Sequence, residues 1–209
     1  MKITVIGAGN MGSAFVKQLT LAGHQVSVTA RDADKAARVA AANPGAKAVP
    51  TAGAAEGADA VVLATGYADA VAALQSVGAL DGKVVIDITN PLTDDYMGLT
   101  IGHDTSAAEQ IAQAVPTAQL VKAFNTVFAQ VLADGSKLHE RTVTVFVASD
   151  SERAKHTAVA LAESMGFETI DAGGLKNARY LEPLAGLNIY LGYGAGLGTA
   201  IAPTWIRQA

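Results

Sequence analysis

Short runs of β-branched and aliphatic residues alternate along the chain with longer stretches in which apolar residues recur at helical spacing. Near-continuous Val and Ile runs are typical of buried parallel strands, and a repeat of three to four residues is typical of amphipathic helices. Strands and helices that take turns in this way predict an α/β fold. Strands are expected at residues 2–6, 25–31, 46–49, 59–64, 83–88, 119–124, 142–147 and 168–171. Helices are expected at residues 14–19, 33–42, 68–77, 106–114 and 152–165.

A glycine-rich turn joins the first expected strand to the first expected helix. In a G-x-G-x-x-G turn, the first glycine permits the tight turn, the second lets the backbone approach a pyrophosphate, and the third lets the helix lie close to the strand. The helix N-terminus behind such a turn presents unpaired N–H groups to an anion. The sequence therefore predicts a dinucleotide site in a Rossmann-type, doubly wound, mostly parallel sheet. The residues of the turn are Gly7, Ala8, Gly9, Asn10, Met11 and Gly12.

The end of the second strand indicates which dinucleotide is bound. An NAD site usually has an acid about 20 residues past the glycine motif, to bind the ribose 2′-hydroxyl. Here Thr29 holds that place, and a hydroxyl can donate to a 2′-phosphate while Arg31 grips it with its planar fork. Lys35 could add a third contact. The alternatives are that Arg31 is a solvated charge beside Asp32, that Thr29 is there only because threonine favours strands, and that Lys35 is an ordinary surface lysine. The pattern favours NADP over NAD.

Composition narrows the chemistry. The chain has 209 residues, half of them apolar, with a net charge of −4 and no basic cluster, so nothing indicates binding to nucleic acid or to anionic lipid. It contains no cysteine and four scattered histidines, which argues against disulfides, thiolate nucleophiles and zinc sites. We expect a cofactor to supply the chemistry and no metal to be bound. No secretion signal is recognisable at the N-terminus, so a cytoplasmic protein is expected.

Polar and turn-forming residues follow three of the expected strands. Ligands of an open α/β sheet bind outside the carboxyl ends of its strands. These residues are therefore expected to border the nicotinamide half of the cofactor and the crevice beside it. They are Ala64, Thr65 and Tyr67 after one strand, Asn90 and Pro91 after the next, and Asn125 after a third.

Ionisable side chains offer little for acid–base catalysis. Lys122 is a candidate for proton transfer because it lies next to strand-end residues, but its place within a strand predicts that it points away from the crevice. Ser106 and Glu109 have the S-x-x-E spacing of a capping box and are expected to satisfy helix N–H groups. None of the histidines pairs with a serine nucleophile. We expect no catalytic side chain.

The C-terminal segment is unusual in being uncharged from Pro183 to Trp205. Its length would permit a membrane span, but five glycines, each costing about 1 kcal/mol in a helix interior, make a poor lone helix. We expect it to pack against the protein, a second subunit or a flat ligand. The whole chain is expected to form one NADP-binding domain over residues 1–209, with residues 175–209 an extension for dimerisation and for the acceptor pocket.

Several segments together resemble the NADPH-dependent reductases of the 8-hydroxy-5-deazaflavin coenzyme and, more loosely, the oxidoreductase domain of the STEAP metalloreductases. The resemblance covers nearly the whole chain, and residues 171–184 are its most specific part. It implies NADP held by the first-turn glycines and by the positions of Thr29 and Arg31. It also implies a flat flavin-like ring stacked on the nicotinamide, with Asn125, Leu175 and Asn188 in the acceptor pocket. The matching segments are residues 7–12, 28–31, 87–91, 121–126 and 171–184.

These observations predict an NADP(H)-dependent oxidoreductase that passes hydride between nicotinamide and a flavin-like or deazaflavin-like acceptor. Hydride transfer between two bound rings needs stacking, orientation and dryness rather than a protein nucleophile. Two alternatives stay open at this point. A reductase of imines or small hydroxy acids would need Lys122 or another proton donor at the nicotinamide. An NADP(H) sensor would bind the dinucleotide without catalysis.

Overall fold

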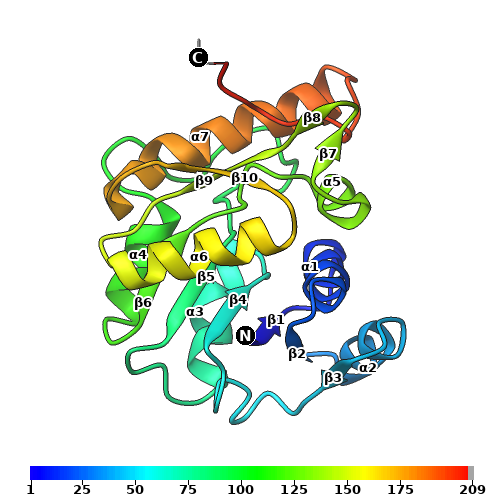
Figure 1. Cartoon of the computed structure of the whole chain (residues 1–209). Coiled ribbons are helices and arrows are strands. Elements are labelled where there is room, and N and C mark those ends of the chain that lie inside the picture. Colours follow the sequence, from blue (N-terminus) through cyan, green and yellow to red (C-terminus); the bar gives the residue numbers. More distant parts are fainter. Residues whose placement is uncertain (207–209) are drawn as a thin grey trace.

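A six-stranded parallel sheet forms the centre of the protein (Figure 1). The computed structural model describes residues 1–206. The strands are β1 (Lys2–Ile6), β2 (Gln25–Thr29), β3 (Ala46–Ala48), β4 (Ala60–Leu63), β5 (Val84–Asp87) and β6 (Gln119–Lys122). Their order is β3-β2-β1-β4-β5-β6, so the direction of winding reverses between β1 and β4. This confirms the predicted Rossmann-type sheet and places its switch point beside the glycine-rich turn.

Helices cover both faces of the sheet (Figure 1). They are α1 (Asn10–Leu21), α2 (Ala33–Ala41), α3 (Tyr67–Ser76), α4 (Ala107–Ala114), α5 (Ala129–Asp134) and α6 (Glu152–Ser164). Residues of α1, α5 and α6 belong to one hydrophobic core and residues of α3 and α4 to another. Along β4, Ala60 and Val62 enter the first core while Val61 and Leu63 enter the second. Because successive side chains of a strand point to opposite faces, a fully apolar strand is needed to build both layers.

The strand expected at residues 142–147 is broken at Val143. Arg141–Thr142 forms β8, which pairs antiparallel with β7 (Lys137–Leu138). Thr144–Val147 forms β9, which pairs in parallel with β10 (Glu168–Asp171). The β-branched run continues through Val143, but its pairing partner changes there, and the N–H of Val143 donates instead to the Ser136 carbonyl. A single strand was thus the wrong prediction, because periodicity does not reveal a change of partner.

The C-terminal segment packs on the same body. A 3₁₀ turn (Leu175–Asn177) leads into α7 (Ala178–Ile189), which ends in a π-helical turn, η2 (Tyr190–Gly194). Leu175 and Ala178 lie in the second core, and Gly196 and Gly198 have φ values of +75° and +78°, where glycine is favoured. Within residues 1–206, no helix has the length and apolar character needed to cross a membrane.

Candidate functional site

The three glycines of the first turn differ in the space around them. A Cβ on Gly7, whose φ is +118°, would collide with the carbonyl oxygen of Ala64, and one on Gly12 would collide with the carbonyl of Gly7. A Cβ on Gly9 would meet no protein atom within 4 Å. Two glycines therefore serve the packing of the turn, while the third leaves room for another molecule. This is the difference that a pyrophosphate cradle requires.

The N-terminus of α1 opens into that space. Gly9 is its N-cap residue, and no side chain caps the helix there. The first N–H groups of a helix have no intrahelical acceptor, so they remain available to an anion. Asn10 is exposed and Ala8 and Met11 are half-buried around the same turn. The fold thus brings the predicted residues of the turn together at one helix terminus.

The second predicted group of residues lies at the end of β2. Thr29 is 1% exposed, and its hydroxyl shares a hydrogen bond of 3.0 Å with the hydroxyl of Thr51. The Thr29 hydroxyl is thus buried and shared with Thr51, and its predicted contact with a 2′-phosphate stays a prediction. The sequence pattern had not singled out Thr51, which lies in the loop after β3. Lys35 is exposed, with its ammonium 4.0 Å from Asp32.

Arg31 is exposed to solvent, as the alternative interpretation supposed, but its ion-pair partner is Asp69 rather than Asp32. Its guanidinium forms a two-pronged ion pair with Asp69 of α3, at 2.9 and 3.2 Å. The Arg31 side chain is 87% exposed, so this pair can open or share its donors at low cost. Two of its five N–H groups are used, and Nε faces no partner among residues 1–206. The guanidinium is thus fixed at the end of β2 with donors to spare.

Residues at the carboxyl ends of β5 and β6 are joined by side-chain amides. Asn90 donates from Nδ2 to the backbone carbonyl of Asn125 at 2.8 Å, and Asn125 donates from Nδ2 to Asn90 Oδ1 at 3.0 Å. At the end of β4, Ala64 lies against the first turn through Gly7, and Thr65 is half-buried. Pro91 follows Asn90 and is buried. The predicted strand-end residues therefore share one edge of the sheet.

Asn125 is held in place by a strained backbone and by α7. Phe124 before it has φ of +60°, although its ring is buried between Phe15 and Phe167 at centroid distances of 5.0 and 5.9 Å. A bulky residue in this conformation costs about 1–3 kcal/mol and persists where its surroundings enforce it. Asn125 Nδ2 also donates to the Leu181 carbonyl at 2.9 Å. The strained turn thus fixes where the amide points.

The three residues expected in the acceptor pocket have different environments. Asn188 lies on the buried side of α7 and donates from Nδ2 to the Thr126 carbonyl at 3.1 Å. Together with Asn125 it attaches α7 to the end of β6. Leu175 instead packs within the second core, 6% exposed. Since it is enclosed by protein, the structure does not present Leu175 to the crevice, contrary to expectation.

Unpaired polar atoms gather at the same edge. Among the residues that the structure describes, Thr89 Oγ1, Asn125 Oδ1 and Thr126 Oγ1 are buried and have no hydrogen-bond partner. Buried polar groups are almost always paired, because leaving one unpaired costs about 1–3 kcal/mol. All three follow β5 or β6. A ligand or ordered water at this edge would satisfy them.

A buried cluster of charges lies just inside these strand ends. Lys122 Nζ is 2.9 Å from Asp87 Oδ2 and 2.8 Å from Glu182 Oε1, and it donates to the Thr89 carbonyl at 2.6 Å. All three charged side chains are at most 2% exposed. Glu182 also accepts the N–H groups of Ala107 and Ala108 at the start of α4, from its place on α7.

Lys122 was expected to point away from the crevice; the structure shows it fully buried, with its ammonium enclosed between the carboxylates of Asp87 and Glu182. Asp87 and Glu182 were not singled out, although a charge ending an apolar strand was a usable signal. Tyr67 lies near this cluster, where burial first, and then the carboxylates of Glu182 and Asp87, raise the pKa of its phenol. Its hydroxyl donates to Gln110. Tyr67 therefore remains protonated at neutral pH.

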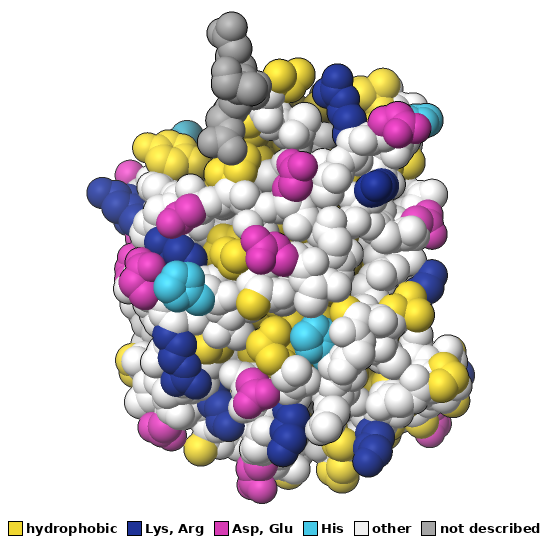
Figure 2. Space-filling model, viewed as in Figure 1, with side chains coloured by type: hydrophobic (Ala, Val, Ile, Leu, Met, Phe, Trp, Pro, Cys, Tyr) yellow, Lys and Arg dark blue, Asp and Glu magenta, His cyan; other side chains and the backbone are white. Residues whose placement is uncertain are grey.

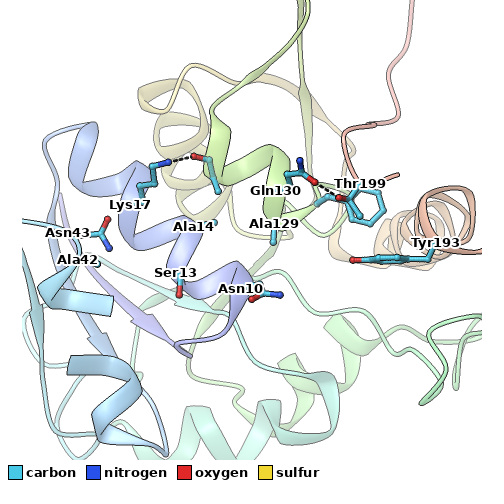
Figure 3. A pocket seen from close by; sticks show the side chains of 12 residues that line it. Asn10, Ser13, Ala14, Lys17, Ala42, Asn43, Ala129, Gln130, Tyr193 and Thr199 are labelled. Atoms are coloured by element: carbon cyan, nitrogen blue, oxygen red, sulfur yellow. Dashed lines mark hydrogen bonds between the residues drawn. The ribbon is translucent and has the colours of Figure 1, made fainter. Parts of the chain in front are cut away.

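A groove of about 620 Å³ lies beside α1 (Figure 3). Asn10, Ser13 and Lys17 of α1 contribute to one side of it, and α5 with residues of the C-terminal segment contributes to the other. The sequence had not indicated this groove, because its walls come from segments far apart in the chain. The other lining residues are Ala14, Ala42, Asn43, Phe128, Ala129, Gln130, Ala133, Tyr193 and Thr199.

Other parts of the surface show less. Basic and acidic side chains are interspersed over the face drawn in Figure 2. Ser106 Oγ accepts the Glu109 N–H at the start of α4, as predicted, but the Glu109 carboxylate accepts from Ser106 Oγ and Arg179 rather than from a helix N–H, so only the serine half of the capping box forms. Glu109 also binds Arg179 at 2.8 Å, and this pairing lowers the pKa of its carboxyl.

Residues 1–206 contain no cluster of three or more His, Cys, Asp or Glu side chains placed to hold a metal ion.

Comparison with known proteins identifies similar chains. Residues 2–91 match the family model described as NADP oxidoreductase, coenzyme F420-dependent. The F420-dependent NADP reductase of Methanothermobacter marburgensis is 34% identical, over 91% of this chain and 92% of that protein. A solved structure from Arthrobacter sp. FB24, described as a candidate F420-dependent NADP reductase, is 31% identical over 99% of this chain and 100% of that one, with a TM-score of 0.90. The metalloreductase STEAP3 of Rattus norvegicus is 29% identical over 88% of this chain, which spans 36% of that longer protein.

Proposed function

Since the chain belongs to the coenzyme F420-dependent NADP oxidoreductase family, we propose that it passes hydride between NADP(H) and a flat flavin or deazaflavin ring. It is an NADP-dependent oxidoreductase; the identity of the acceptor is the proposal. The observation that best supports the NADP(H) site is the difference in free space around the three glycines of the first turn. Gly7 and Gly12 are packed against backbone, whereas the space beside Gly9 is open at an uncapped helix N-terminus.

The residues of the chain bind and orient the cofactor. The turn from Gly7 to Gly12 would hold the pyrophosphate, and Arg31, with Lys35 nearby, would hold the 2′-phosphate. When bound, the reduced nicotinamide supplies a hydride to the acceptor ring, which amounts to two electrons and one proton. The second proton of the reduction comes from solvent. Asn90, Pro91 and Tyr67 would border the nicotinamide. The unpaired side-chain oxygens of Thr89, Asn125 and Thr126 would accept hydrogen bonds from ring or amide N–H groups.

The ionisable groups at this edge favour transfer between two rings. A reductase of imines or hydroxy acids would place a proton donor at the nicotinamide, and Lys122 was the candidate. Its ammonium is fully enclosed by Asp87 and Glu182, and the protonated Tyr67 donates to Gln110. Neither is free to act. Initial rates of NADPH oxidation with flavins, the deazaflavin coenzyme and ferric chelates will test the assignment, and activity with chelates alone would contradict it.

Removing Arg31 tests the choice of cofactor. We expect Arg31→Ala to weaken NADPH binding roughly tenfold or more, because a charge-assisted contact contributes about 1.5–3 kcal/mol, and to leave NADH binding almost unchanged. Titration calorimetry with both dinucleotides measures this. Arg38→Ala, on the exposed side of α2, removes the same charge and should change neither affinity. Equal losses for NADPH and NADH in the Arg31 variant would remove the basis for the 2′-phosphate assignment.

We also propose that residues 1–209 form one domain whose C-terminal part, residues 175–209, mediates dimerisation. Tyr180, Leu187 and Tyr190 are each at least half exposed and lie on one side of α7 and the turn that follows. Hydrophobic side chains also gather at the upper edge of Figure 2, where Figure 1 places α7. An apolar strip of this kind is typical of a protein interface. A second copy of the chain would cover it.

Charges placed in this strip should separate the dimer. The double substitution Leu187→Asp with Tyr190→Asp is expected to give monomers in sedimentation experiments, because it buries two unpaired carboxylates in the interface. NADPH affinity should be unchanged, since neither residue contacts the first turn. Leu21→Asp, on a residue that is also exposed but lies at the end of α1, is the control and should leave the assembly intact. A double variant with native sedimentation would show that α7 is not the interface.

A further inference from the structure

The groove beside α1 starts where the hydride crevice ends. At one end Asn10 directly follows Gly9 of the first turn, and Phe128 lies shortly after Asn125 at the end of β6. Phe128 and Tyr193 form an edge-to-face pair there, with ring centroids 5.8 Å apart. From this apolar end the groove continues along α1 toward Lys17 (Figure 3). A ligand whose ring lies in the crevice could therefore extend a side chain into the groove.

The walls of the groove combine alanine and aromatic side chains with uncharged polar ones, and they carry one charge. Asn10, Ser13 and Lys17 are spaced three and four residues apart, which places them on one side of α1. Gln130 and Thr199 face them, with the Thr199 hydroxyl donating to Gln130 Oε1. Such amides and hydroxyls can both donate and accept hydrogen bonds. They suit a hydroxylated chain better than an apolar one.

Lys17 places one positive charge at the far end of the groove. Its ammonium donates to the Ala133 carbonyl at 2.7 Å, and Gln18 Nε2 donates to the same oxygen at 2.9 Å. This contact fixes the ammonium and leaves two of its three N–H donors unused. No acidic residue lines the groove, and Lys17 forms no ion pair with a carboxylate in the described part of the chain. An anionic group at this point would therefore be attracted.

Resting on the function proposed above, we propose that this groove binds the hydroxylated, phosphorylated side chain of the acceptor, with Lys17 contacting its phosphate. Flavin mononucleotide and the deazaflavin coenzyme share this chemistry, a ribityl chain with a phosphate attached to a flat ring. The dinucleotide does not compete for the groove, because its phosphates are assigned to the first turn and to Arg31 at the end of β2. The groove volume of about 620 Å³ is within the range of small-molecule sites.

Acceptors with and without the phosphate test this proposal. Kinetics of NADPH oxidation are measured with flavin mononucleotide against riboflavin, and with the deazaflavin coenzyme against the same ring carrying an unphosphorylated ribityl chain. In Lys17→Gln, we expect the KM for the phosphorylated acceptor of each pair to rise about fivefold, with kcat unchanged. A fivefold change corresponds to the upper end of the free energy that an exposed ion pair contributes. The KM for the unphosphorylated member and the Kd for NADPH should not change. Lys17→Arg should restore most of the loss, and Lys137→Gln on the exposed strand β7 should behave as the native protein.

The outcomes separate this inference from the function on which it rests. Reduction of the rings with no difference between phosphorylated and unphosphorylated acceptors in Lys17→Gln would overturn the groove assignment alone. An equal rise for both acceptors, or a weaker Kd for NADPH, would overturn it as well. If no flavin or deazaflavin is reduced, the proposed function fails. Calorimetric binding of flavin mononucleotide and riboflavin to the protein loaded with NADP⁺ still decides the groove, since only the phosphorylated compound should lose affinity in Lys17→Gln.

Discussion

Gly9→Val is expected to fold as the native chain does and yet to bind NADPH too weakly for titration to detect. The backbone at Gly9 is extended, with φ of −82° and ψ of −167°, which valine adopts readily. Its Cβ would meet no atom within 4 Å beyond the neighbouring residues of the chain, so the site has room for a side chain. The same side chain would occupy the space that the pyrophosphate needs. Circular dichroism, thermal unfolding and calorimetric titration together measure both halves of this expectation.

Two further glycines provide the comparison. Gly102→Val, at a half-buried loop position where a Cβ also meets nothing within 4 Å, should change neither folding nor NADPH affinity. Gly12→Ala should instead destabilise the protein, because its Cβ would collide with the Gly7 carbonyl. Only the substitution at Gly9 should abolish NADPH binding while leaving folding unchanged. If Gly9→Val bound NADPH within about twofold of the native affinity, the turn would not bind the phosphates. Blocking a pyrophosphate site should weaken affinity by much more than tenfold, that is, by more than about 1.4 kcal/mol.

Lys122→Met should lower the free energy of unfolding by about 3–5 kcal/mol. The substitution leaves Asp87 and Glu182 buried beside each other without the ammonium that neutralises them. Glu182 would retain its two backbone donors at the start of α4, but Asp87 would retain only the Thr89 N–H. Chemical denaturation gives the value directly.

Lys155→Met is the matched control for this measurement. Lys155 also binds two carboxylates, Glu152 at 3.4 Å and Asp171 at 3.1 Å, but these partners are 75% and 59% exposed. Its loss should therefore cost about 1 kcal/mol or less, as for other exposed pairs. Similar values for the two variants would show that the cluster at Lys122 does not contribute more than a surface pair. That result would also weaken the view that it attaches α7 to the sheet.

The glycine-rich turn and the strand ends could be predicted because their signals are local. Gly7 to Gly12 lie between a strand and a helix, and parallel strands bring their carboxyl ends to one edge whatever their side chains are. The ion pairs could not be predicted in this way. Lys122 finds Glu182, and Arg31 finds Asp69, only once the sheet and helices have packed.

The direction in which a side chain points also could not be predicted from the sequence. Thr29 holds the sequence position of a 2′-phosphate ligand, but the fold turns its hydroxyl inward to Thr51. Leu175 lies in a segment with strong resemblance to the family, yet it packs in the core. The strained φ of Phe124, which sets the orientation of Asn125, has no signature in sequence because phenylalanine rarely adopts it. Position along the chain thus predicted which residues reach the edge of the sheet, but not where their side chains point.

The central claim, direct hydride transfer between nicotinamide and a flat ring, is tested by following the hydrogen itself. NADPH with deuterium at C4 of the nicotinamide, prepared as each stereoisomer, is incubated anaerobically with the protein and the deazaflavin coenzyme in ordinary water. Deazaflavin is the informative acceptor, because the hydrogen it receives at C5 is bound to carbon and does not exchange with solvent. We predict that deuterium from one stereoisomer appears at C5 of the reduced ring, and none from the other. Reduced deazaflavin without deuterium from either stereoisomer, or no reduction at all, would contradict the account.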